Sequence, residues 1–328
     1  AIGTAALGGS VAGGEYNVAV GNYSLDALTS ADGVTAVGYN AGTAITTGNK
    51  SVFIGYAAGA GITTGSDSIF IGYEAGDGYD AETDNIGIGR SALGGSIAGG
   101  NKNVGMGNYA LDALTSADNS VAIGYEAASG TTTGGDNTAV GYQSLFTNTI
   151  GINNACIGAQ SGYAVTEGND NTCLGYVAGQ QITTGDDNTM LGYFGGANLT
   201  TGSNNICIGH TSGVDSGSAA NVICIGININ ASSNDFSFGK SGNIVTNDFD
   251  ADANWSRASD VRKKRNIYNQ ELGLDFINDL RTVRFQWKPS NEFPKEWNDY
   301  SEENNMDTDV IMHGFIAQEV KEALDKHA

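Results

Sequence analysis

The chain has 328 residues, of which 49 are glycine and 2 are proline, and its 36 acidic and 15 basic side chains give a formal net charge of −21. A surface this acidic argues against nucleic acid as a partner, because binding to phosphates needs cationic patches. No apolar stretch is long enough to span a bilayer, so no membrane insertion is expected. The four cysteines and three histidines form no metal-binding pattern, and neither a metal nor a cofactor is predicted. The first residues already belong to a repeat, so we expect the chain to be the C-terminal part of a longer protein.

A short β-prone core that ends in glycine recurs along the chain as far as Gly226. It reads VAVG ending at Gly21, VFIG ending at Gly55 and ICIG ending at Gly226. Successive core glycines are seventeen positions apart, with a single longer step of eighteen from Gly89 to Gly107. This period is too short for helical repeats and predicts a parallel β-solenoid with one coil per repeat. Thirteen such coils, stacked about 4.8 Å apart, would form a rod on the order of 60 Å long.

Two apolar columns run through the repeat cores. The residue directly before the core glycine is Val, Ile, Leu or Met, as at Val20 and Ile54, and we expect this column to fill the coil interior. The residue one place earlier is small or apolar, as at Ala19 and Phe53, and faces the other way. Because a strand that is apolar on both faces is buried on both faces, the second column is predicted to meet partner chains.

All four cysteines lie in this second column, at Cys156, Cys173, Cys207 and Cys224. A metal ladder and interchain disulfides are possible uses of such a column. Free cysteine also behaves as a small buried hydrophobe. We favour that role, because cysteine alternates freely with Ala, Phe and Met in the column.

The turns of the repeat are equally regular. Asparagine four places before the core glycine, as at Asn188, and glycine seven places before it, as at Gly185, suit tight turns and positive φ. The core glycine itself is predicted to turn the chain sharply into a second short strand, which carries Ala58 or its equivalent.

The turn residues could also serve two other functions of solenoid proteins. Threonine pairs such as Thr46-Thr47 could form an ice-binding array, but they precede glycine in a turn and do not alternate along a flat strand. Turns such as Asp186-Asp187 could bind calcium, but the GGxGxDx pattern of calcium-binding β-rolls is absent. Neither function is favoured.

The VAIG-type core, followed by alanine three places later, resembles the head repeats of trimeric autotransporter adhesins and of many phage tail fibres. The resemblance extends from residue 1 to about residue 230, although the period of this chain is longer than the usual one in those families. It implies a left-handed β-roll and three rolls packed around a threefold axis.

The repeat period breaks after residue 230. The next core, FSFG, ends early at Gly239, and Gly242-Asn243 predicts a hairpin turn, so residues 231–258 are interpreted as a β connector. Beyond it, the apolar spacing of residues 272–280 predicts an amphipathic helix and that of residues 283–287 predicts a strand. Residues 289–309 are polar and predict a loop, and residues 315–324 predict a final helix.

The hexamer SDVRKK, residues 259–264, is the one candidate for covalent chemistry. A serine hydroxyl is a weak nucleophile unless a nearby base takes its proton, and serine–lysine pairs are one such arrangement. Lys264 follows Ser259 closely enough for one turn to bring its amine to the hydroxyl. The alternative is structural: Ser259 and Asp260 are good helix N-cap residues, and basic clusters are usually solvated.

The same hexamer resembles the SDxRxK signature of the intramolecular chaperone domain of phage endosialidases and tail fibres, the S74 peptidase family. Asn266-Ile267, LRTVRFQWK at 280–288 and HGFIAQEV at 313–320 agree with that family in the same order. The family continues into further helices, so the domain is expected to be incomplete at its C-terminus.

This resemblance implies a domain that trimerises, guides the upstream rod to fold and then cuts itself off. Ser259 would be the nucleophile, Lys264 the general base and Ala258–Ser259 the cleaved bond, while Asp260 and Arg262 would shape the turn. Self-cleavage is the only enzymatic activity expected, with no turnover of external substrates.

The sequence therefore predicts a mainly β protein: a trimeric parallel β-solenoid at residues 1–230, the connector at 231–258 and a small α+β chaperone domain at 259–328. The expected function is the distal part of a bacteriophage tail fibre, assembled as a homotrimer in the host cytoplasm and carried on the extracellular virion tail. Its expected partner is a host cell-surface receptor, for which a glycan is anticipated. The alternatives are a bacterial trimeric surface adhesin, and a tailspike depolymerase with a carboxylate pair in a groove.

Overall fold

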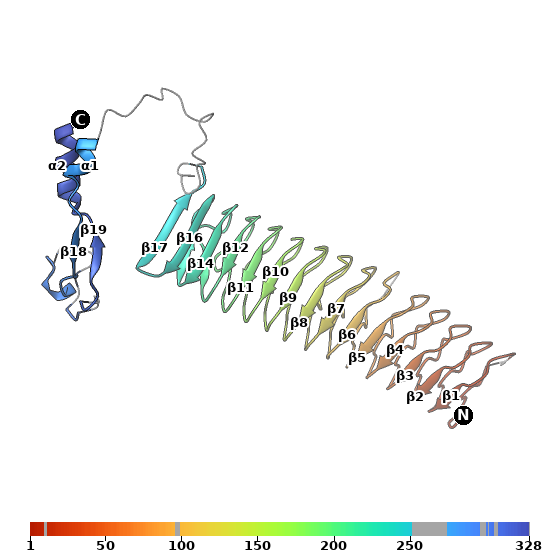
Figure 1. The fold of residues 1–328 in the computed structure, drawn as a ribbon. Coiled ribbons are helices and arrows are strands. Elements are labelled where there is room, and N and C mark those ends of the chain that lie inside the picture. Colours follow the sequence, from red (N-terminus) through yellow and green to blue (C-terminus); the bar gives the residue numbers. More distant parts are fainter. Residues whose placement is uncertain are drawn as a thin grey trace. The chain divides into compact units, whose positions relative to one another are not determined.

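The computed structural model describes residues 1–9, 12–95, 99–250, 274–295, 300, 302–304 and 308–327. The chain divides into two compact units, Ala1–Ser256 and Arg257–Ala328. Strands and turns build the described part of the first unit, the rod, and helices with a small sheet build that of the second (Figure 1). No helix within these ranges is long and apolar enough to cross a membrane.

Thirteen short strands stack along the rod, one per coil (Figure 1). They lie side by side in chain order and each is parallel to the next, so the predicted parallel β-solenoid is confirmed. The partners Val18↔Thr35 show the regular register between coils, and Ile86↔Val104 shows the single longer step. The strands are β1 (Val18–Val20), β2 (Thr35–Val37), β3 (Val52–Ile54), β4 (Ile69–Ile71), β5 (Ile86–Ile88), β6 (Val104–Met106), β7 (Val121–Ile123), β8 (Thr138–Val140), β9 (Ala155–Ile157), β10 (Thr172–Leu174), β11 (Thr189–Leu191), β12 (Ile206–Ile208) and β14 (Ile223–Ile227).

A hairpin ends this sheet. Strand β16 (Asp235–Lys240) pairs parallel to β14, and β17 (Asn243–Asp248) turns back antiparallel to β16. The turn at Ser241-Gly242 has a positive φ of 84° at the glycine, as the predicted hairpin requires. Strands β13 (Ser212–Val214) and β15 (Ile229–Ala231) follow β12 and β14 in the chain. They pair parallel to each other in a separate two-stranded sheet.

The two apolar columns face the opposite way to the prediction. The column two places before the core glycine points into the coil, and Ala19 and Phe53 are 1% and 0% exposed. The column directly before the glycine lies on the outer face, with Ile54 38% and Leu174 42% exposed. The interior also holds side chains from the turns, so it accepts Ala, Gly or Cys on the strand more readily than a uniform row of large aliphatic residues.

We call this outward column the aliphatic stripe. Every member is at least partly exposed in the single chain, and none is charged. The stripe consists of Val20, Val37, Ile54, Ile71, Ile88, Met106, Ile123, Val140, Ile157, Leu174, Leu191, Ile208 and Ile225.

Two interior positions share the volume of a coil. Where the central strand residue is Phe53, the residue six places later is Gly59, and a Cβ there would lie 2.4 Å from the Phe53 ring. Where the central residue is Ala139, the residue six places later is Leu145, which is fully buried. A large side chain at one position is thus matched by a small one at the other, as dense packing requires.

The core glycines adopt a backbone conformation, and lie so close to the next coil, that a side chain would not fit. Gly158 has a φ of +137°, and a Cβ on it would lie 2.2 Å from the carbonyl oxygen of Gly175 in the next coil. In the earlier coils the segment after the core glycine is a run of turns and not the predicted second strand, because left-handed residues such as Ala57 (φ 52°) interrupt extended backbone. A second strand does follow the last two core glycines, as β13 and β15.

The asparagine column is internal and does not supply the positive φ that was predicted. Asn188 is buried, and its Nδ2 donates to Asn171 Oδ1 at 2.9 Å and to the carbonyl oxygen of Gly202 at 3.0 Å. The left-handed residue is its neighbour Asp187, with φ 57°. The asparagines therefore form an amide ladder that pairs buried polar groups between coils.

The second unit contains helix α1 (Leu274–Asp279), strand β18 (Val283–Phe285), the short 3-10 helix η3 (Ser290–Glu292), strand β19 (Met312–Gly314) and helix α2 (Ala317–His327). Strands β18 and β19 pair antiparallel. The first helix, the strand and the final helix appear where the sequence predicted them, whereas β19 was not predicted.

Candidate functional site

The residues predicted to carry the cleavage chemistry lie outside the described part of the chain. Ala258, Ser259, Asp260, Arg262 and Lys264 all fall between residues 251 and 273. Their assignment stays a prediction. The Asn266-Ile267 motif lies outside the described residues as well, whereas the motifs at residues 280–288 and 313–320 are described.

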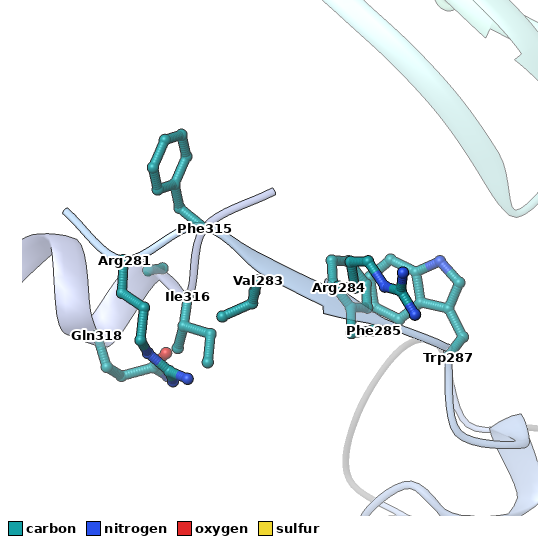
Figure 2. Close-up of a pocket in the computed structure, with 9 residues that line it drawn as sticks. Arg281, Val283, Arg284, Phe285, Trp287, Phe315, Ile316 and Gln318 are labelled. Atoms are coloured by element: carbon teal, nitrogen blue, oxygen red, sulfur yellow. The ribbon is translucent and has the colours of Figure 1, made fainter. Parts of the chain in front are cut away.

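These two motifs meet at one groove of about 420 Å³. Figure 2 shows Val283 and Ile316 at its centre, with Arg281 and Gln318 at one end and Arg284, Phe285 and Trp287 at the other. The rings of Phe285 and Trp287 pack edge to face, with centroids 5.3 Å apart. Such a surface can bind an apolar chain segment, and Arg284 can pair with a carboxylate of that segment. Its described lining holds no serine, cysteine or histidine that could act as a nucleophile or base.

Ion pairs join the two helices and the β18 region. Lys326 Nζ donates to Asp279 Oδ2 at 2.6 Å, and His327 Nε2 lies 2.6 Å from the same oxygen. The hydrogen bond from Lys326, followed by the contact with His327, lowers the pKa of Asp279. Arg281 Nε donates to Glu319 Oε2 at 3.0 Å, and the hydrogen bond from Arg281 likewise lowers the pKa of Glu319. Sequence reasoning missed these pairs, because their partners are far apart in the chain.

Acid is expected to loosen helix α2. The folded-state pKa values of Asp279 and Glu319 are lowered, so their ion pairs stabilise the docked helix at neutral pH. This contribution is lost as the pH falls through those values, below about pH 4. We expect faster hydrogen exchange of the α2 amides at pH 3 than at pH 6, after correction for intrinsic rates. The Asp279→Asn variant should lose part of this dependence, and equal protection at both pH values would contradict the assignment.

The second unit exposes most of its described apolar side chains. Leu274, Ile277 and Phe315 are 72%, 58% and 53% exposed. Among its described residues, Ala323 is the one buried apolar side chain. A unit of this size needs a hydrophobic core to fold stably, so these surfaces are suited to packing against further protein.

Residues 259–328 match the family model described as chaperone of endosialidase. This segment is an endosialidase-type chaperone domain. Neither the curated proteins nor the solved structures contain a match to the chain. A thirteen-coil β-solenoid followed by this chaperone fits a tail-fibre-like protein. The chaperone domain supports a role in the trimerisation and folding of a fibre or tailspike.

Upstream of the chaperone domain, tyrosines stack beside the aliphatic stripe, in the position directly after the core glycine. The rings of Tyr39 and Tyr56 are stacked with centroids 5.4 Å apart, and those of Tyr56 and Tyr73 are 5.0 Å apart. The guanidinium of Arg90 lies 5.6 Å from the ring centres of both Tyr73 and Tyr109. Stacked tyrosines therefore border the outer sheet face, and Arg90 continues this border by packing on two of their rings.

The cysteine column behaves as the buried hydrophobe that the sequence favoured. All four cysteines are free and buried. Burial raises the pKa of Cys207 to about 12. The hydrogen bond with Cys173, together with burial, raises the pKa of Cys156. Thiols in this state are poor metal ligands and poor nucleophiles.

The threonines and aspartates of the turns are used within the rod. Thr46 Oγ1 donates to the carbonyl oxygen of Thr63 in the next coil at 3.0 Å, so this hydroxyl is not free to order ice. Asp186 Oδ1 accepts from the backbone N of Asn169 at 2.7 Å. Within the described ranges, no group of three His, Cys, Asp or Glu side chains could hold a metal ion.

Proposed function

We propose that the chain is the distal part of a homotrimeric bacteriophage tail fibre that attaches the virion to a host surface. In this proposal, the chaperone domain aligns three chains, the rods then pack together, and the domain cuts itself off. The observation that carries the proposal is the aliphatic stripe, which remains exposed along thirteen coils of the single chain.

Charge supports the stripe as the contact between copies. Residues 1–258 contain 22 acidic and 5 basic side chains, a net charge of −17, so copies repel one another over most of their surface. The stripe itself is uncharged, and stacking it against two further stripes would remove its aliphatic side chains from water. Each square ångström of apolar surface buried in this way contributes about 25 cal/mol.

The repeat explains why such a rod needs a chaperone. Coils of nearly equal sequence can pair one coil out of register at little cost, because each coil offers almost the same outer face. A domain that joins three chains at one end sets the register before the coils pack. Cleavage afterwards makes the folded fibre kinetically hard to reverse.

The cleavage chemistry follows the serine–lysine arrangement. Lys264 accepts the hydroxyl proton of Ser259, and the hydroxyl oxygen attacks the carbonyl carbon of Ala258. The peptide C–N bond breaks, the nitrogen takes the proton back from Lys264 and leaves as the amine of Ser259, and an ester joins Ala258 to the serine oxygen. Water then hydrolyses this ester and releases a product that begins at Ser259.

Substitution of either predicted catalytic residue should abolish cleavage. We expect denaturing mass spectrometry of the full chain to detect a product beginning at Ser259. This product should be lost in Ser259→Ala and in Lys264→Ala. The Lys263→Ala variant is the matched control, because it removes a neighbouring lysine outside the proposed pair, and should still cut. Cleavage that persists in both catalytic variants would rule the mechanism out.

A further inference from the structure

A hollow of about 240 Å³ opens between the coils that carry β10 and β11, the green part of the rod in Figure 1. Three side-chain amides line it, from Gln180, Gln181 and Asn198. Phe194 and Val177 also line it, and Val177 is only 3% exposed. No lining residue is charged, although the rod as a whole is strongly acidic.

The glutamine amides of the hollow are free to bind a ligand. Gln180 and Gln181 make no side-chain hydrogen bond to any residue of the described ranges. Gln143 and Gln160, in the two coils before, are engaged: Gln160 Nε2 donates to Gln143 Oε1 at 3.2 Å, and Gln143 in turn donates to Glu126 at 2.7 Å. The free amides are thus a local feature and not a general property of the rod's glutamines.

Asn198 and Phe194 are held in place by contacts outside the hollow. Asn198 Nδ2 donates to the carbonyl oxygen of Val214 at 3.2 Å, which leaves its Oδ1 as an acceptor. The Phe194 ring packs on Tyr193 with centroids 4.7 Å apart and planes at 55°. The site therefore offers both donors and acceptors next to a fixed aromatic ring.

The amides also break the repeat. In the nine coils before them, the residue six places after the core glycine is Ala, Gly or Thr. The next two coils have Gln181 and Asn198 there. The smaller residues show that the coil does not need an amide at this position to fold. A residue that departs from the repeat without a structural need is expected at a functional site. The residues concerned in the nine coils are Ala27, Ala44, Gly61, Gly78, Gly95, Ala113, Gly130, Thr147 and Ala164.

From this geometry we infer that the hollow binds one neutral sugar residue of a glycan. Sugar hydroxyls donate and accept hydrogen bonds, as amides do, and the C–H face of a sugar can pack on the ring of Phe194. The volume lies below the roughly 300–1,000 Å³ of sites for drug-sized ligands, which suits a single ring. An acidic sugar is disfavoured, because no cation lines the hollow and the rod is acidic. The inference deepens the proposed attachment function and rests on it.

Saturation-transfer NMR on the full chain tests the site. The probes are the methyl glycosides of glucose, galactose and N-acetylglucosamine, with N-acetylneuraminic acid as the acidic comparison. We expect transfer to at least one neutral sugar and none to the acid. The signal should be lost in the Gln181→Ala/Asn198→Ala double variant and kept in Gln143→Ala, whose amide is engaged elsewhere. Transfer to none of the neutral sugars, or a signal that survives the double variant, would overturn the inference.

The same samples separate this inference from the proposed function. Sedimentation equilibrium reports the assembly and mass spectrometry reports the cleavage. A self-cleaving trimer that binds none of the sugars would overturn the sugar site and leave the fibre proposal standing. A monomer that binds a neutral sugar through Gln181 and Asn198 would support the site and contradict the trimer.

Discussion

Two aspartates in the middle of the aliphatic stripe are expected to turn the proposed trimer into monomers while the coils stay folded. Ile157 and Leu174 are neighbours in the stripe and are 41% and 42% exposed in the single chain, so Ile157→Asp and Leu174→Asp leave the coil interior unchanged. In the trimer, the double variant would bring six carboxylates together away from water. Each buried and unpaired charge costs several kcal/mol.

Sedimentation equilibrium measures this loss, and circular dichroism checks that the β structure remains. The matched control is Thr184→Asp with Thr201→Asp, which adds the same two charges to adjacent coils at exposed positions outside the stripe. This control should remain trimeric. A stripe variant that sediments as a trimer would show that another face joins the copies.

Removal of the Phe53 ring is expected to destabilise the rod strongly, and a second substitution should repair much of the loss. Phe53 is fully buried, and replacement of a buried phenylalanine by alanine typically costs about 3–5 kcal/mol. The Phe53→Ala/Gly59→Leu double variant reproduces the Ala139–Leu145 pair of another coil. Leu145 has a φ of 53° and Gly59 a φ of 61°, so leucine is already accepted in this backbone conformation.

Urea unfolding of the four members of this mutant cycle gives the test. Gly59→Leu alone should also destabilise the rod, because its side chain would collide with the Phe53 ring. The double variant should recover about half or more of the loss, after the roughly 1–2 kcal/mol cost of a left-handed leucine. Phe146→Ala, at a partly exposed aromatic residue, is the control and should cost much less. If the stability losses of the two single variants simply add up in the double variant, the two positions do not share one volume.

Much of the rod could be predicted from the spacing of its glycines. A constant step between core glycines fixes which residues pair in a parallel stack. The one longer step appears as the register Ile86↔Val104, and the one shorter step appears as the register Ile223↔Phe236. The direction of the side chains could not be predicted in the same way. Both columns are apolar, so hydrophobicity alone does not distinguish interior from surface, and the variation in size from Ala19 to Phe53 was the unused signal.

The second unit was predicted less completely. Local apolar spacing located helices α1 and α2 and strand β18, because each carries its own pattern. Strand β19 was missed, since Met312–Gly314 is short and is held by pairing with β18, which is distant in the sequence. The hollow lined by Gln180, Gln181 and Asn198 was also missed, because glutamine and asparagine are common in polar turns. Comparison of the position six places after each core glycine would have singled out Gln181 and Asn198.

Sedimentation equilibrium of the unmodified chain is the most direct test of the account as a whole. We predict a particle of three chains, both before the chaperone domain is released and after it has been cut off. A particle of one chain across the accessible concentration range would contradict the account, because neither the exposed stripe nor the aligning domain would then have copies to join.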